Sequence, residues 1–211
     1  MLRLTFGRKW HFLVTLFLIT IITGVCINMG REQVELTATQ PIHLPVLSVQ
    51  SFWLQALAVA QEWHPDAYVS GVRVDVPLPT RKVYPEGYPS VRFSFQSPGE
   101  NYVTLVILCN AEKCHSFEVE QNPQYPLEQC TPINLNDFTL DSGEVVDIGL
   151  EYGGEDYINL PTADVDLMLF RDIPSCSGQV KWRISFTDFA TRKEVALVID
   201  AVTGEVIEVR E

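Results

Sequence analysis

The amino-acid sequence predicts an α+β protein: two tandem modules, each a helix packed on an antiparallel sheet, after an N-terminal transmembrane helix. Three observations support this fold class. An uncharged apolar run follows a basic N-terminus, period-two strand patterns dominate the remainder, and the order helix-then-strands occurs twice. The 211 residues suit one large domain or two small ones, and 46% apolar residues exclude a disordered chain.

The charge of the chain is unevenly distributed. Lys+Arg number 15 and Asp+Glu number 27, which gives a net charge of −12. Residues 1–30 contain Arg3, Arg8 and Lys9 and no acidic residue, so the remainder carries 12 − 27 = −15. Because an acidic chain repels phosphate backbones, we expect no nucleic acid among its partners.

Residues 10–29 form the apolar run, which as a helix would extend roughly 30 Å, enough to cross a bilayer core. Its basic flank predicts a cytoplasmic N-terminus, extracytoplasmic modules and contact with membrane lipid. A cleaved signal peptide is the alternative, but Val25 and Ile27 interrupt the small residues that cleavage requires. A lipoprotein signal fails because Val25 precedes Cys26. We therefore expect an uncleaved, single-pass anchor in a bacterial cell membrane, with residues 1–30 as cytoplasmic edge and transmembrane helix.

The first module is expected over residues 51–125, after a proline-containing linker at 31–50. Its helix begins with Ser51 as N-cap and stops at Pro65, whose ring disfavours helical geometry at the preceding residue. Apolar residues then alternate with polar ones, which predicts strands over 67–78, 91–97 and 102–110.

The second module is expected over residues 126–211. Its helix begins at Asp141 or Ser142 and ends at Gly153-Gly154. Strands are predicted at 163–171, 181–189, 194–202 and 205–210. Residues 91–110 overlay 182–201 without a gap, with Arg92 on Arg183 and Phe95 on Phe186, which indicates a tandem duplication.

The run WRISF at 182–186 and the run ALVIDAVTGEVI at 196–207 resemble the end of a PepSY domain. The resemblance is good over about residues 140–211 and weaker over 50–120. It implies cystatin-like modules and a role in inhibiting or regulating peptidases, since the family occurs in peptidase propeptides. In the hairpin, Asp200 and Thr203 are expected to cap the turn and Gly204 to adopt a positive φ.

Four cysteines follow the apolar run, and they allow three pairings. A zinc site is the alternative, since His115 adjoins Cys114, but no second close-spaced ligand pair accompanies them. The internal overlay puts Cys109 and Cys114 on opposing sides of a hairpin, where a disulfide can form. We therefore favour Cys109–Cys114, which leaves Cys130 to pair with Cys176.

The sequence contains no nucleophile elbow, no H-E-x-x-H and no phosphate-binding glycine loop, so we expect no enzyme, no cofactor and no metal. The loop YPEGYPS at 84–90 makes Tyr84 and Tyr88 candidate partner contacts, with a loop that packs on itself as the alternative. Many carboxylates are interpreted as a solvated face, with weak Ca²⁺ binding or electrostatic docking to a basic partner as the alternatives. They are Asp141, Glu144, Asp147, Glu151, Glu155, Asp156, Asp164 and Asp166.

The expected function is that of a membrane-anchored, non-catalytic, extracytoplasmic protein-binding module. Such a module would serve as an accessory or regulatory subunit of a membrane complex, with protein partners that the chain does not identify. A PepSY-type peptidase inhibitor or regulator is the second hypothesis. An enzyme on a cystatin-like scaffold is the third.

Overall fold

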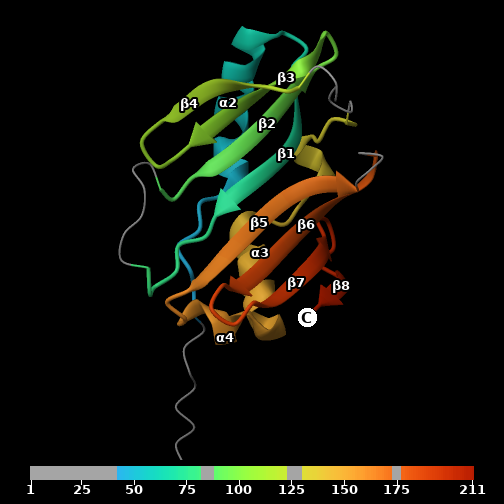
Figure 1. Cartoon of the computed structure of the whole chain (residues 1–211). Helices are drawn as coiled ribbons and strands as arrows, with labels where there is room; N and C mark the ends of the chain where they lie inside the picture. The colour runs from blue at the N-terminus through green and yellow to red at the C-terminus, as the bar shows by residue number, and fades with distance from the viewer. Residues whose placement is uncertain (1–41, 82–87, 123–129, 173–176) are drawn as a thin grey trace, which may run out of the picture. The chain divides into compact units, whose positions relative to one another are not determined.

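A continuous antiparallel sheet of eight strands forms the body of the protein (Figure 1). The computed structural model describes residues 42–81, 88–122, 130–172 and 177–211. Residues His43–Glu211 belong to one compact unit. The strand order is β4-β3-β2-β1-β5-β6-β7-β8, so the first strand of each half of the chain lies in the middle of the sheet.

The first half is a helix followed by four consecutive strands. Helix α2 begins after Ser48, whose side chain accepts the N–H of Ser51, so the N-cap lies three residues before the expected one. The helix ends before His64, because Pro65 disfavours helical geometry at the residue that precedes it. The elements are α2 (Val49–Trp63), β1 (Tyr68–Asp75), β2 (Val91–Ser97), β3 (Glu100–Cys109) and β4 (Cys114–Glu120).

The second half repeats this order with a more irregular helical segment. The expected helix divides at a π-turn, in which Gly153 has a φ of 104°, and resumes for one further turn. The helical elements are the 3-10 turn η1 (Leu135–Asp137), α3 (Ser142–Gly149), the π-turn η2 (Leu150–Gly154) and α4 (Glu155–Ile158). The strands are β5 (Ala163–Asp172), β6 (Ser177–Asp188), β7 (Lys193–Asp200) and β8 (Val206–Arg210).

The two halves join through their first strands. Strand β1 pairs antiparallel with β5, with Val72 opposite Leu169 and Asp75 opposite Asp166. This pairing corrects the expected fold class. The structure is one mostly antiparallel sheet with few helices, not two tandem cystatin-like modules, because the seam hydrogen bonds merge both meanders into one sheet.

The membrane expectation also requires correction. Residues 1–41, which include the apolar run at 10–29, lie outside the described residues. Among the helices that the structure describes, none is long and apolar enough to span a bilayer. The structure therefore does not support the single-pass location expected from the sequence.

The gap-free overlay of the two halves is wrong by one residue in its second strand. It places Phe93 on Ile184 and Ile107 on Val198. In the sheet, however, Phe93 pairs with Ile107, whereas Ile184 pairs with Leu197. A bulge after Phe95 precedes the β2–β3 turn, whereas β6 and β7 pair without interruption as far as their turn. A one-residue shift exchanges the two faces of a strand, so the duplicated order holds only with this offset.

Helices α2, α3 and α4 lie on one face of the sheet, where the core forms (Figure 1). An aromatic chain connects the two halves across this core. Trp53 contacts Phe93 and Phe138 at ring-centroid distances of 5.8 and 5.4 Å, and Phe138 contacts Trp182 at 6.4 Å. The Trp182 indole donates to the carbonyl of Leu140 at 3.1 Å, which satisfies its buried N–H.

Candidate functional site

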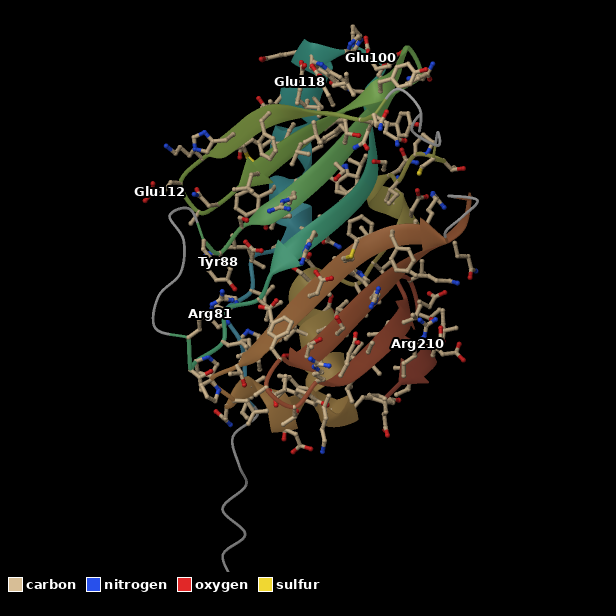
Figure 2. The ribbon with its side chains drawn as sticks, in the orientation of Figure 1. Arg81, Tyr88, Glu100, Glu112, Glu118 and Arg210 are labelled. Atoms are coloured by element: carbon tan, nitrogen blue, oxygen red, sulfur yellow. A yellow bond between two sulfur atoms is a disulfide. The ribbon has the colours of Figure 1, made fainter. Side chains whose placement is uncertain are left out.

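The face of the sheet opposite the helices carries many of the polar side chains of the strands (Figure 2). Strand residues alternate, so the residues between the buried core positions point to this open face. One row crosses all eight strands in register. It comprises His115, Leu108, Arg92, Arg73, Met168, Arg183, Val198 and Glu208.

A hollow of about 300 Å³ opens on this face where β1, β2 and β5 meet, and we call it the seam groove. Both halves of the chain contribute to its lining. Its side chains combine three cations, two carboxylates, an aromatic ring, a serine and a leucine. They are Arg73, Arg81, Arg92, Asp75, Asp164, Tyr88, Ser90 and Leu108.

A second hollow, of about 490 Å³, continues from the seam groove and shares Tyr88 and Leu108 with it. Its far wall is the β3–β4 hairpin, and we call it the hairpin hollow. This wall adds Glu112, Lys113 and His115. The two hollows together form one trough, with the half-buried ring of Tyr88 at their junction.

Most charged side chains of the seam groove take part in ion pairs. Arg73 Nε lies 2.6 Å from Asp166 Oδ1, outside hydrogen-bonding geometry, and Arg81 Nη1 donates to Asp164 Oδ1 at 3.3 Å. Both pairs connect the first half of the chain to β5. The two aspartates that the sequence assigned to a solvated face are therefore salt-bridge partners, and they hold arginine side chains over the seam.

Ser90 and Asp75 form the end wall of the seam groove. The Ser90 hydroxyl donates to Asp75 Oδ2 at 2.6 Å, and the Ser90 N–H donates to the same oxygen at 3.2 Å. Ser90 is only 4% exposed. This serine therefore fastens the start of β2 to the end of β1 and does not present a nucleophile to a ligand.

Arg92 differs from the other two arginines of the seam groove. It lies directly opposite Arg73 in the β1–β2 pair, and its side chain is exposed. Among the hydrogen bonds and ion pairs of the described residues, none involves the Arg92 guanidinium, whereas Arg73 and Arg81 both have carboxylate partners. Like charges directly opposite each other on a sheet are destabilising. Arg92 is therefore the cation of the seam groove that is available to pair with an anionic ligand.

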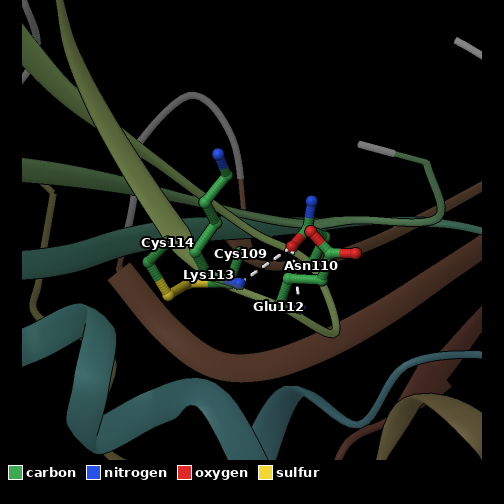
Figure 3. The surroundings of a disulfide bond; sticks show 5 residues. All are labelled: Cys109, Asn110, Glu112, Lys113 and Cys114. Atoms are coloured by element: carbon green, nitrogen blue, oxygen red, sulfur yellow. Dashed lines mark hydrogen bonds between the residues drawn. A yellow bond between two sulfur atoms is a disulfide. The ribbon is translucent and has the colours of Figure 1, made fainter. Parts of the chain in front are cut away.

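A disulfide closes the hairpin that bounds the trough (Figure 3). Cys109 and Cys114 face each other across β3 and β4 and form a disulfide, with their Cα atoms 4.0 Å apart. Asn110 Oδ1 accepts the N–H groups of Glu112 and Lys113 at 2.9 and 3.0 Å, which shapes the turn. The structure thus contains the disulfide that the overlay favoured.

The remaining candidate residues lie in three places. Cys130 is disulfide-bonded, but Cys176 lies outside the described residues, so the pairing of these two stays a prediction. Tyr84 also lies outside them, whereas Tyr88 is at the junction of the two hollows.

At the β7–β8 turn, the N–H groups of Thr203 and Val202 donate to the Asp200 carboxylate and lower its pKa. Gly204 has a φ of 76° in the same turn, so this hairpin is a structural device.

A further hollow of about 680 Å³ lies near the other end of the sheet, and we call it the edge hollow. It includes Arg183, Lys193 and Arg210. Arg210 donates to both carboxylate oxygens of Glu208, at 2.7 and 3.2 Å, and this contact lowers the pKa of the glutamate. The edge hollow is larger than the seam groove, but it is built from Tyr157 of α4, turn residues and β6–β8, without a contribution from the first half.

Sequence patterns alone do not identify the arginines of the seam groove as site residues. Their outward direction was detectable, since Arg73 alternates with Val72 and Val74, and Arg92 alternates with buried residues of its own strand. Their proximity was not detectable, because it depends on which strands pair. As for metals, the described residues contain no group of three or more His, Cys, Asp or Glu side chains that could hold an ion.

Comparisons with known proteins add little to this geometry. No protein-family model and no curated protein matches the chain. Among solved structures, the crystal structure of a candidate lipoprotein from Clostridium difficile 630 is similar, with 12% sequence identity and a TM-score of 0.48. The match covers 75% of this chain and 91% of that one. A likeness at this level carries no argument about fold or function, so any function of this chain must be inferred from the residues of the site.

Proposed function

We propose that the chain is a non-catalytic protein-binding module that acts as an accessory or regulatory subunit of a larger assembly through its open sheet face. The observation that carries this proposal is the trough beside Tyr88, on a face that α2, α3 and α4 leave uncovered. A surface with an aromatic ring and arginines is typical of contact sites in protein complexes.

The chemistry of the trough favours binding over catalysis. Its serine is buried against Asp75, and its two seam aspartates are engaged by Ser90 and Arg81. These contacts fix the shape of the surface, and they leave no serine or aspartate of the seam groove positioned as nucleophile or base. Peptidase inhibition, which the PepSY resemblance implies, stays a prediction that an inhibition assay with purified peptidases can test.

Affinity purification of the tagged full chain from its source organism tests the proposal. We compare wild type with Tyr88→Ala and with Arg92→Gln. The control is Gln61→Glu, at an exposed position of α2, because it changes the net charge by the same −1 as Arg92→Gln. We expect a stoichiometric protein partner with wild type and with the control, and a reduced amount with both trough variants. A chain that purifies without a partner, or a partner retained equally by all four proteins, would contradict the proposal.

A further inference from the structure

We infer that the trough binds a short acidic peptide segment of the partner, whose carboxylates engage Arg92 and its neighbouring cations. This inference deepens the proposed function and rests on it. It names the chemical class of the ligand, and it assigns Arg92 as the residue that recognises a carboxylate.

The charges of the trough differ from those of the chain as a whole. The chain carries −12 overall, whereas the trough, with the Asp166 carboxylate that pairs with Arg73, is formally neutral: Arg73, Arg81, Arg92 and Lys113 stand against Asp75, Asp164, Asp166 and Glu112, so 4 − 4 = 0, with His115 counted as neutral. A neutral hollow repels an anionic group less than the rest of an acidic surface does, so its cations can bind one.

The cations of the seam groove differ in whether a carboxylate already balances them. Arg73 and Arg81 are paired with Asp166 and Asp164, so their charge is balanced within the protein. Arg92 stands against Arg73 in register, exposed, with no carboxylate among its contacts in the described part of the chain. A carboxylate bound at Arg92 would relieve the repulsion between the two guanidinium groups and would match the fork geometry of arginine.

The shape and the apolar walls of the trough also suit a peptide. Tyr88 and Leu108 line both hollows, and Pro89 adds to the wall beside the hairpin. Apolar wall between cations suits a peptide, in which apolar side chains alternate with acidic ones. The disulfide and the Asn110 turn hold the far wall, which reduces the ordering needed when a ligand binds.

The net charge selects a short segment over a long polyanion. A nucleic acid would bring many phosphates close to a chain of −12, whereas a few carboxylates interact mainly with the trough. The ligand class is therefore a peptide with two or three acidic residues within a few positions of each other.

The test is isothermal titration of the full chain with two capped hexapeptides, one of alternating Glu and Ala and one of alternating Gln and Ala. We expect the glutamate peptide to bind and the glutamine peptide not to bind. Arg92→Gln should weaken binding by about tenfold, because it removes a charge-assisted contact. The control Lys193→Gln makes the same charge change at the edge hollow, and we expect it to weaken binding by less than about twofold.

Four outcomes would overturn the inference. They are no binding of the glutamate peptide, equal binding of both peptides, an unchanged affinity in Arg92→Gln, and a larger loss in Lys193→Gln than in Arg92→Gln. Inorganic phosphate, titrated alone, gives a further distinction: binding of phosphate without binding of the glutamate peptide would replace the peptide ligand with a small anion. If the purification identifies a partner that depends on the trough but the peptides fail, the proposed function stands and only this inference falls.

Discussion

Asp141 Oδ1 accepts the backbone N–H of Val49 at 2.8 Å, although the two residues are 92 positions apart in the chain. The same oxygen accepts the N–H of Ser142 at 2.8 Å, and the Ser142 hydroxyl donates to the carbonyl of Leu47 at 2.6 Å. Asp141 is the N-cap of α3, and Val49 is the first residue of α2. One carboxylate therefore serves the N-termini of both helices and ties the two halves together at a further place, apart from the strand seam and the aromatic core.

Replacement of Asp141 should affect both helices. We expect Asp141→Ala to lower the free energy of unfolding by about 2 kcal/mol, because loss of each cap costs roughly 1 kcal/mol. Asp141→Asn keeps an acceptor oxygen and should lose less than about 1 kcal/mol. The measurement is urea denaturation followed by circular dichroism. Asp147→Ala, on the exposed side of the same helix, is the control, and an equal loss in both alanine variants would contradict the double cap.

Gly149 and Gly154 allow the helical segment of the second half to approach Phe186 of β6. A Cβ atom on Gly154 would lie 2.5 Å from Phe186 Cζ and 2.7 Å from the backbone oxygen of Gly149. Since the backbone oxygen cannot give way as a flexible side-chain end can, we expect Gly154→Ala to lose about 2 kcal/mol of stability.

Gly143 provides the matched control in the same helical region. A Cβ atom there meets nothing within 4 Å, so Gly143→Ala should be neutral or stabilise the protein by about 0.5 kcal/mol through helix propensity. Thermal unfolding of both variants measures the contrast. A Gly154→Ala protein as stable as Gly143→Ala would show that both Phe186 and the backbone at Gly149 can shift at little cost.

The sequence predicted the local elements better than their pairing. The period-two runs at 91–97 and 194–202 correspond closely to β2 and β7, because buried and exposed positions alternate in them. The same alternation says which residues face the core, but it does not say which strand lies alongside. The β1–β5 pair, with Val72 opposite Leu169, joins residues so distant in sequence that no local pattern identifies it, and this pair decides the fold class.

Strand β4 shows a second limit of sequence patterns. It is an edge strand, and Glu118 lies opposite the buried Leu105, on the face where central strands have apolar residues. Exposed charge on an edge strand prevents pairing with other chains. It also removes the alternation of apolar and polar residues by which a strand is predicted. The candidate site shows the same limit. Tyr88 is identified from its residue type and its loop, whereas Arg73, Arg81 and Arg92 come together only when the strands pair.

The disulfide at the end of the trough should contribute measurably to stability. Cys109 and Cys114 are separated by five positions, and closing so short a loop is expected to stabilise the fold by about 2 kcal/mol through the unfolded chain. We expect the double variant Cys109→Ala with Cys114→Ala to lose about this amount in urea denaturation. Asn110→Ala, which removes only the side-chain acceptor of the turn, should lose about 1 kcal/mol or less. A double variant as stable as wild type would show that the hairpin needs no covalent clamp.

Mass mapping of a digest under non-reducing conditions tests the other pairing. We expect a peptide linking Cys130 to Cys176, since Cys130 is disulfide-bonded and Cys109 and Cys114 bond to each other. The same digest after reduction is the control, because the linked mass must then divide into its two components. A peptide linking Cys26 to Cys130 would contradict the prediction.

Asp188 provides a pH dependence that can be measured. It lies at the end of β6 and is 4% exposed, where its carboxylate accepts the hydroxyls of Thr162 and Thr191 at 2.5 and 2.6 Å. These two hydrogen bonds, followed by those from the N–H groups of Ala190 and Thr191, lower the pKa of Asp188 from 3.8 to about 2. A carboxyl group with a lowered pKa in the folded state stabilises the protein above its unfolded pKa, and this stabilisation disappears as the pH falls toward the folded pKa.

We therefore expect the advantage of wild type over Asp188→Asn to be constant above about pH 5 and to shrink between pH 4 and pH 2. The direction follows from proton binding: in this range the unfolded chain takes up a proton at Asp188 while the folded protein does not. Acid therefore destabilises wild type through this group, whereas Asp188→Asn lacks that contribution. Urea denaturation of both proteins at several pH values measures it, and Thr162→Val should show a smaller pH effect than wild type because one hydrogen bond is removed. A difference between wild type and Asp188→Asn that stays constant down to pH 2 would show that this carboxylate is not held by Thr162 and Thr191 in solution.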